Sequence, residues 1–297
     1  MRLGVKTRPL VEEDTGTQAA SGRLKNNGIT GYGGLVRIVR LVALALLITS
    51  PLPGQTGFLD RVITLHGETY RYQVYIPADY TSSKVWPLIV SLHGNGRQGS
   101  NGMLQTGTDF AIRIRQNRAP FPAIVVFPQA RTGTRWLFPD MEELVIVEMN
   151  RERAAFRVDT TRIYLQGYSM GGTGSYRIAF RSPETFAAIV VVAGRVEPGA
   201  AYSSAEIEMD RRTNAFVAAP DPFASLAAGL KHIPIWIFHG DADETVPVAQ
   251  SRQLVAALRK VGAQVRYTEL PGADHNTAPP KAYADSGLFE WLLAQHR

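Results

Sequence analysis

A glycine-flanked serine in the segment Gly167–Gly172 constrains the fold of this chain more than any other stretch. The run Arg162–Gln166 before it is rich in β-branched and aromatic residues, which predicts a strand. The residues Thr173–Phe180 after it predict a helix that ends before Pro183. A Gly-x-Ser-x-Gly motif between a strand and a helix is typical of a tight, strained turn that lifts a serine hydroxyl above the edge of a sheet. Ser169 is therefore the candidate nucleophile.

Apolar runs and helical patterns alternate along most of the remaining chain. Continuous apolar runs, which predict strands buried on both faces, occupy Pro87–Gly94, Ala123–Pro128, Phe186–Gly194 and Ile233–Gly240. Alternating runs predict a last strand at Val265–Leu270 and an antiparallel hairpin at 60–76. Helices are predicted at 103–117, 140–156, 247–261 and 281–296. This order predicts an α/β fold with a mostly parallel, doubly wound sheet, helices on both faces and an N-terminal hairpin.

A serine nucleophile needs a base that takes its proton and an acid group that orients the base. In folds that carry the nucleophile on a strand–turn–helix motif, these groups follow in the order Ser, Asp or Glu, His. His275 is the candidate base, because it lies in a loop after both the serine and an acidic residue. His93 and His239 each precede a glycine at the end of a predicted buried strand, and we expect both to be structural.

The candidate acid lies in the loop that follows the strand ending at Gly240. Three acidic residues occur there, and spacing favours Asp243 as the group that accepts the proton of the base. Asp241 lies next to the glycine, where a carboxylate commonly caps a turn, and Glu244 is an alternative that a solvated surface position would also explain.

Backbone amides beside Ser169 are the candidate donors of an oxyanion hole. The Met170 amide follows the nucleophile directly, and the loop after the strand ending at Gly94 offers the amide of Asn95. Trp136 and Tyr168 are candidate contacts for an aromatic or sugar group of a substrate.

Composition excludes several classes of site. The chain has no cysteine, which excludes disulfides, a thiol nucleophile and cysteine metal sites. We also expect no cofactor and no metal. The net charge is +6, but residues 1–55 hold seven Lys and Arg against three Asp and Glu, which leaves only +2 for the rest. A nearly neutral folded part does not favour nucleic acid as a partner.

The N-terminal region is expected to lie outside the folded domain. Residues 1–35 are polar and glycine-rich, which predicts a disordered leader or an over-long start. Residues 36–56 carry two arginines, a short apolar run and a proline-rich end, which predicts a signal peptide and a secreted or periplasmic location without a stable membrane anchor. We expect a single domain at 57–297, with a lid-like insertion at 195–229.

These motifs resemble the α/β-hydrolase superfamily. Within it the chain is similar to secreted polyhydroxybutyrate depolymerases, feruloyl and acetylxylan esterases, and phospholipase/carboxylesterase or "predicted peptidase" type serine hydrolases. The stretches that carry the resemblance are Pro87–Gly96, Val158–Gly172, Ile233–Pro247, Val265–His275 and Trp291–Leu293. The run His239-Gly240-x-x-Asp243-x-x-Val246-Pro247 matches the acid motif of these proteins, so the resemblance implies Asp243 as the acid. It also implies His275 as the base.

The resemblance implies a secreted serine esterase that cleaves carboxylic esters through an acyl-enzyme. Small-molecule, polysaccharide or polyester esters are the expected substrates. A serine peptidase of the same fold is the alternative within the enzyme class. The other alternative is a non-catalytic binding protein on a hydrolase scaffold, which the presence of all three candidate residues disfavours.

Overall fold

The computed structural model describes residues 55–117 and 119–297. The predicted leader at 1–35 and all but the last two residues of the predicted signal peptide at 36–56 lie outside these ranges. Within the described ranges no helix is both long enough and apolar enough to cross a bilayer.

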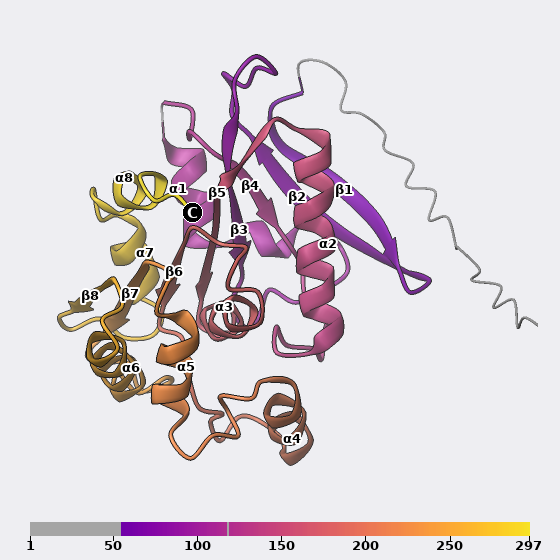
Figure 1. The fold of residues 1–297 in the computed structure, drawn as a ribbon. Coiled ribbons are helices and arrows are strands. Elements are labelled where there is room, and N and C mark those ends of the chain that lie inside the picture. Colours follow the sequence, from indigo (N-terminus) through magenta and orange to yellow (C-terminus); the bar gives the residue numbers. More distant parts are fainter. Residues whose placement is uncertain (1–54, 118) are drawn as a thin grey trace, which may run out of the picture. The chain divides into compact units, whose positions relative to one another are not determined.

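The core of the structure is an eight-stranded sheet with the order β1-β2-β4-β3-β5-β6-β7-β8 (Figure 1). Its strands are β1 (Gly57–Leu65), β2 (Glu68–Ile76), β3 (Trp86–Leu92), β4 (Ile124–Phe127), β5 (Val158–Tyr168), β6 (Ala188–Val192), β7 (Ile235–Gly240) and β8 (Val265–Leu270). β1 and β2 form an antiparallel hairpin, and β2 pairs antiparallel with β4. All further pairings are parallel. The predicted mostly parallel sheet and its N-terminal hairpin are confirmed.

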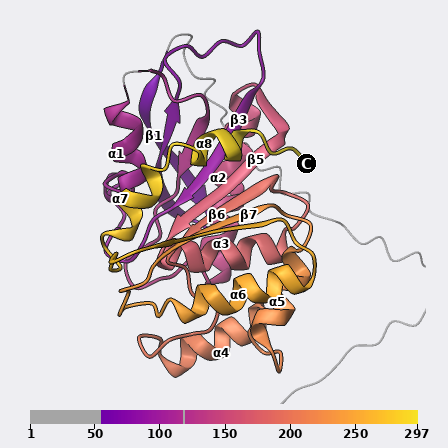
Figure 2. The same ribbon diagram turned by 90° about the vertical axis from the view of Figure 1, so that its left-hand side faces the viewer.

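Helices cover both faces of the sheet, as predicted (Figure 2). They are α1 (Asp109–Gln116), α2 (Pro139–Ala155), α3 (Met170–Arg181), α4 (Ser204–Thr213), α5 (Pro222–Leu230), α6 (Ala249–Lys260), α7 (Ala278–Tyr283) and α8 (Leu288–Leu293), with a short 3-10 helix at Leu104–Thr106. Apolar residues of α2, α3, α5 and α6 pack on one face, and those of α1, α7 and α8 pack on the other.

The sequence predicts one continuous C-terminal helix at 281–296, and this prediction is wrong. The structure has two short helices instead, α7 and α8, separated by a turn. In that turn the Asp285 carboxylate accepts a hydrogen bond from the Gly287 amide, and the Asp285 carbonyl accepts one from Leu288. The periodicity of the apolar residues hides this break, because both short helices bury their apolar side chains against the same face of the sheet.

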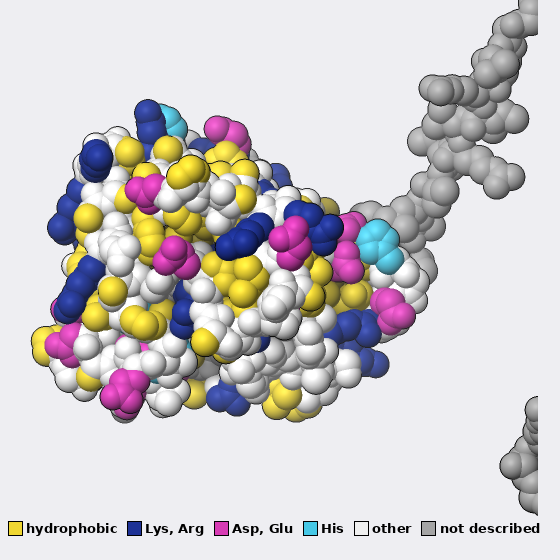
Figure 3. All heavy atoms as spheres, turned by 90° about the horizontal axis from the view of Figure 1, so that it is seen from below, with side chains coloured by type: hydrophobic (Ala, Val, Ile, Leu, Met, Phe, Trp, Pro, Cys, Tyr) yellow, Lys and Arg dark blue, Asp and Glu magenta, His cyan; other side chains and the backbone are white. Residues whose placement is uncertain are grey.

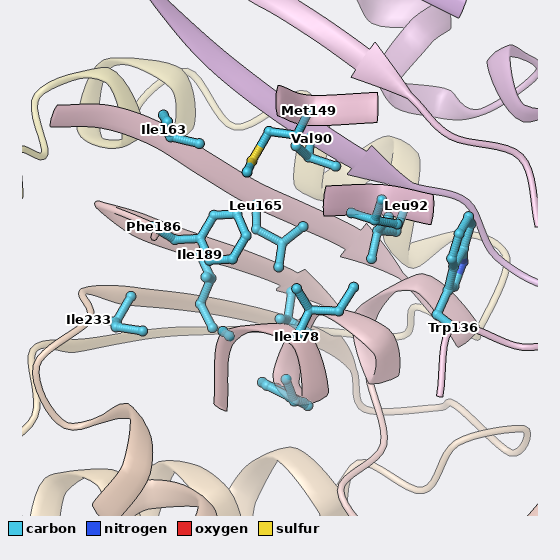
Figure 4. Packing of buried hydrophobic residues seen from close by; sticks show 14 of the residues in the cluster. Val90, Leu92, Trp136, Met149, Ile163, Leu165, Ile178, Phe186, Ile189 and Ile233 are labelled. Atoms are coloured by element: carbon cyan, nitrogen blue, oxygen red, sulfur yellow. The ribbon is translucent and has the colours of Figure 1, made fainter. Parts of the chain in front are cut away.

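The interior of the sheet explains its long apolar runs. Every residue of β3, β4, β6 and β7 is buried. On one face, Leu165 and Ile189 of neighbouring strands pack with Ile178 of α3 and Met149 of α2 (Figure 4). Burial on both sides of a parallel strand leaves no alternation of polar and apolar residues.

The segment 195–229 contains α4 and all but the last residue of α5, two helices that the sequence does not predict. A fully buried ion pair attaches it to α3: Arg177 donates from Nε and Nη2 to the two carboxylate oxygens of Asp210, over 2.8 and 2.5 Å. Arg177 also donates to the Val196 carbonyl. On the outer surface of this region, Figure 3 shows charged side chains of both signs interspersed with apolar ones.

We expect Asp210→Ala to lower the free energy of unfolding by about 3–5 kcal/mol, because it leaves the Arg177 guanidinium buried without a counter-charge. Urea unfolding followed by circular dichroism measures the loss. The matched control on the same helix is Glu208→Ala, which breaks an exposed pair with Arg212 at 3.8 Å and is expected to cost under about 1 kcal/mol. Equal losses of unfolding free energy in the two variants would contradict the prediction that the buried pair contributes more than the exposed one.

Candidate active site

The turn between β5 and α3 holds Ser169 in a strained conformation. Its φ is 56° and its ψ is −117°, a left-handed φ that non-glycine residues seldom adopt. A Cβ at Gly167 would overlap the backbone of Gly171, and a Cβ at Gly171 would overlap the carbonyl of Leu92. Both glycines are therefore required by close backbone approach, for the reason that the sequence motif predicts.

Three sequence-predicted residues from three loops come together at the carboxyl edge of the sheet. The Ser169 hydroxyl lies 2.8 Å from Nε2 of His275, and Nδ1 of His275 lies 2.7 Å from Oδ2 of Asp243. The histidine thus joins the hydroxyl to the carboxylate through its two ring nitrogens. Asp241, the neighbouring acidic residue, instead accepts a hydrogen bond from the Gly272 amide.

The Asp243 carboxylate is held by several donors. Its Oδ1 accepts hydrogen bonds from the amides of Thr245 and Val246. Burial alone would raise the pKa of Asp243, but hydrogen bonds from His239, His275 and the Val246 amide outweigh it and hold the pKa below its usual range. The carboxylate is therefore ionised at neutral pH.

His239 has a closer relation to Asp243 than the sequence suggests. This fully buried ring lies with Nε2 3.3 Å from Oδ2 of Asp243 and 2.8 Å from the carbonyl of Val246. Because a carbonyl only accepts, Nε2 carries the proton, and Nδ1 faces the Ser251 hydroxyl at 2.6 Å. The spacing of four residues between His239 and Asp243 was the available signal, but the position at a strand end favoured a structural role.

The loop after β3 passes directly beside Ser169. A Cβ at Gly94 would lie 3.4 Å from the Ser169 Cβ and 3.0 Å from the Tyr168 ring. Gln98 fixes the loop, because its amide accepts from the Gly96 N–H and donates to the Asn95 side chain, each at 2.8 Å.

Among the described residues, no acceptor lies within hydrogen-bond distance of the backbone amides of Asn95 and Met170. Met170 begins helix α3, so its amide has no intrahelical acceptor. The two amides that the sequence predicts as donors therefore have no hydrogen-bond partner within the described part of the chain.

His93 stiffens the start of the same loop. Burial lowers its pKa to about 4, so the ring is neutral at pH 7. Its Nε2 accepts from the Ala130 amide at 3.1 Å, which leaves Nδ1–H to donate to the Gly94 carbonyl. The structural role expected for His93 therefore agrees with its contacts.

A cavity of about 620 Å³ opens beside the serine. Ser169, His275, Asn95 and Tyr168 all line it. The Tyr168 hydroxyl donates to the His275 carbonyl at 2.8 Å, which fixes the tyrosine ring against the histidine loop.

Trp136 does not reach this cavity. It is 0% exposed, and its indole N–H donates to the His93 carbonyl at 2.9 Å. The expectation that Trp136 contacts a substrate is therefore corrected: the loop after β4 folds inward and uses the ring as core (Figure 4). Within the described ranges, no group of three His, Asp or Glu side chains is placed to hold a metal ion.

Comparisons with known proteins agree with the fold. The sequence profile of the prolyl oligopeptidase family matches residues 144–295, about half of the chain. A thermostable esterase of known structure is 28% identical with a TM-score of 0.63, over 81% of this chain and 63% of that chain. These matches confirm the predicted α/β-hydrolase fold and the resemblance to its serine hydrolases.

Two relatives are similar over much of the sequence. A probable feruloyl esterase C from Aspergillus terreus is 28% identical over 174 residues, which cover 56% of this chain and 63% of the relative. An uncharacterized secreted protein from Arthroderma benhamiae is 25% identical over 216 residues, which cover 70% of this chain and 23% of the relative. The chain thus spans less than two thirds of the length of either relative.

Proposed function

Because this chain belongs to the prolyl oligopeptidase family, we propose that it is a serine hydrolase that cleaves carboxylic esters through an acyl-enzyme. The observation that carries the proposal is the hydrogen-bonded chain from Ser169 through His275 to Asp243 beside an open cavity. The similarity to a thermostable esterase and to a probable feruloyl esterase favours ester substrates, on small molecules or on polysaccharides.

The proposed reaction begins when the Ser169 oxygen attacks the ester carbonyl carbon while Nε2 of His275 takes the hydroxyl proton. Ionised Asp243 stabilises the imidazolium and holds Nδ1–H in place. The amides of Asn95 and Met170 stabilise the negative oxygen of the tetrahedral intermediate. His275 then protonates the leaving alcohol, the C–O bond breaks, and water attacks the acyl-enzyme by the same steps to release the acid.

A serine peptidase of the same fold is the second candidate, favoured by the name of the family. The two candidates differ in the leaving group, an alcohol or an amine. We therefore propose to compare p-nitrophenyl acetate, butyrate and octanoate with blocked aminoacyl p-nitroanilides, using the full chain. The esterase proposal expects ester kcat/KM values at least about 100-fold above the anilide values after correction for intrinsic reactivity. Preference for an anilide would establish the peptidase instead, and failure to cleave either class would favour a binding protein.

We propose that the protein is secreted, with 36–56 as its signal peptide and 57–297 as the mature domain. The name of the Arthroderma benhamiae relative supports secretion.

The insertion at 195–229 is proposed to be a fixed wall near the loop that holds Asp243. The ion pair of Arg177 and Asp210 attaches it to α3, and Arg195 donates to the Thr245 carbonyl at 2.8 Å.

His239 is expected to keep the proposed acid ionised. In His239→Leu the pKa of Asp243 should rise toward its usual range, because one donor to the carboxylate is lost. Since a higher pKa means protonation at higher pH, the Asp243 carboxylate should lose its charge at a higher pH than in the wild type. We also expect kcat/KM at pH 7 to fall by about tenfold, as for loss of a hydrogen bond to a charged group. NMR titration of the Asp243 carboxyl carbon measures the change in pKa, and steady-state kinetics at pH 7 measure the loss of kcat/KM.

Ser251→Ala is the control for His239→Leu, because it removes only the hydrogen bond on the far side of the ring. His239→Gln keeps an N–H donor and is expected to recover part of the wild-type pKa of Asp243 and part of the wild-type rate. A His239→Leu variant with the wild-type pKa of Asp243 and the wild-type rate would show that the ring only fills space.

A further inference from the structure

The floor of the cavity beside Ser169 is polar, although the sheet that forms it is apolar. Ser91 of β3 and Gln166 of β5 are paired in register on neighbouring parallel strands, and each is 3% exposed. Tyr283 of α7 is 4% exposed. All three residues line the cavity.

These polar residues interrupt an apolar surface at the point where the strands reach the cavity. Side chains two residues apart on a strand share a face, and two positions earlier stand Ile89 and Tyr164, both in the core cluster beneath α1 and α7. Ser91 is also the only polar residue of β3, whose every position is buried. Burying a polar group costs free energy unless it is hydrogen-bonded, so the partners of these two side chains decide what they cost the fold.

The hydrogen bonds within the floor leave some of its N–H and O–H donors without acceptors. The Tyr283 hydroxyl donates to Gln166 Oε1 at 2.6 Å, and Gln166 Nε2 donates to the Ser91 hydroxyl. Burial raises the pKa of Tyr283, so the phenol keeps its proton. Among the described residues, the Ser91 O–H and the second N–H of Gln166 have no acceptor. The floor therefore offers two donors to whatever fills the cavity.

Two charged side chains, Arg97 and Asp109, line the cavity, and besides burial the Asp109 carboxylate raises the pKa of Tyr283. Arg97 is exposed and Asp109 is half-buried, and they carry opposite charges. The buried end itself consists of a hydroxyl, an amide and a protonated phenol, none of which carries a charge. Since an unpaired charge is costly to bury, this end suits a neutral group.

We propose that the part of the ester that fills this cavity carries a neutral hydrogen-bond acceptor, an ether, hydroxyl or carbonyl oxygen, several bonds from the scissile carbonyl. The Ser91 hydroxyl and the Gln166 amide donate to that oxygen, and Tyr283 orients the amide. This specificity rests on the proposed esterase function. It distinguishes the substrate from plain alkyl esters, which would leave two buried donors without acceptors.

Matched pairs of esters test the proposal, each pair differing by one methylene exchanged for oxygen. The acyl pair is p-nitrophenyl pentanoate and p-nitrophenyl 3-methoxypropanoate, and the alcohol pair is butyl acetate and 2-methoxyethyl acetate. Each is also used with two further methylene groups before the exchanged atom. The readout is the ether-to-alkyl ratio of kcat/KM, divided by the same ratio for hydroxide-catalysed hydrolysis.

The triple variant Ser91→Ala/Gln166→Met/Tyr283→Phe replaces all three polar side chains of the floor by apolar ones. None of the three positions then keeps a polar side-chain group that lacks a partner. Tyr164→Phe is the matched control, because this tyrosine lies on the same face but donates to the carbonyl of Gln295. The wild type and the control are expected to prefer the ether by about three- to tenfold in at least one pair. The triple variant should lose that preference.

An unchanged ratio in the triple variant, or no preference in the wild type, would overturn the proposal. If the triple variant does not fold, Ser91→Ala alone provides the same comparison, with loss of at least half of the preference expected. Labelling of the wild type by a fluorophosphonate separates this failure from a failure of the proposed function. If the enzyme is labelled and hydrolyses esters without preferring the ether, only the proposed role of the floor is refuted. If it is neither labelled nor active on esters, the proposed esterase function is refuted.

Discussion

Ser169→Ala is expected to lower kcat for ester hydrolysis by about 10⁶-fold, the loss that follows removal of the nucleophile from a serine triad. The hydroxyl at 2.8 Å from His275 is the only side-chain group in the proposed reaction that forms a bond to the acyl carbon. Binding and the amides of Asn95 and Met170 remain, so a small residual rate is expected. Steady-state hydrolysis of p-nitrophenyl butyrate by the full chain measures this loss.

The control for Ser169→Ala is Ser182→Ala, a serine at the other end of α3 that is remote from the cavity. It should keep the wild-type rate within about twofold. A Ser169→Ala variant with near wild-type turnover would exclude the acyl-enzyme mechanism.

Asp243→Asn is expected to lower kcat by about 10⁴-fold with the fold intact. The amide has almost the same shape as the carboxylate and still accepts the Thr245 and Val246 amides through its oxygen. Its nitrogen would then face Nδ1 of His275, which favours the tautomer with a proton on Nε2. A histidine with that proton cannot accept one from Ser169. Steady-state kinetics measure the loss, and circular dichroism checks the fold.

Asp241→Asn is the matched control for the acid. The two residues lie in one loop, but Asp241 accepts only the Gly272 amide in this structure. It should retain kcat within about threefold. If Asp241→Asn loses the activity and Asp243→Asn keeps it, the assignment of the acid is wrong.

The predictions that hold best from sequence alone depend on backbone geometry. Gly167 and Gly171 predict the turn because steric overlap permits no side chain at either position. The buried runs predict parallel strands because burial on both faces removes the alternation of polar and apolar residues. Since parallel strands end at one edge of the sheet, the loops holding Ser169, Asp243 and His275 had to lie at that edge.

The features that the sequence missed depend on packing between distant segments. Nothing local distinguishes a tryptophan on a cavity wall from Trp136, whose ring is covered by the core and bonded to the loop after β3. His239 looked structural because only the folded loop brings its ring against Asp243. Likewise, the polar floor requires Ser91, Gln166 and Tyr283 to meet from two strands and a helix far apart in sequence.

The central claim is that Ser169 is a nucleophile activated by His275. A fluorophosphonate probe tests it most directly, because the probe phosphonylates an activated serine whatever its natural substrate. The full chain should be labelled at Ser169 alone, as mapped by mass spectrometry, and labelling should be lost in Ser169→Ala and slowed at least about 100-fold in His275→Ala. A wild-type protein that remains unlabelled, or that is labelled at another residue, would contradict the account.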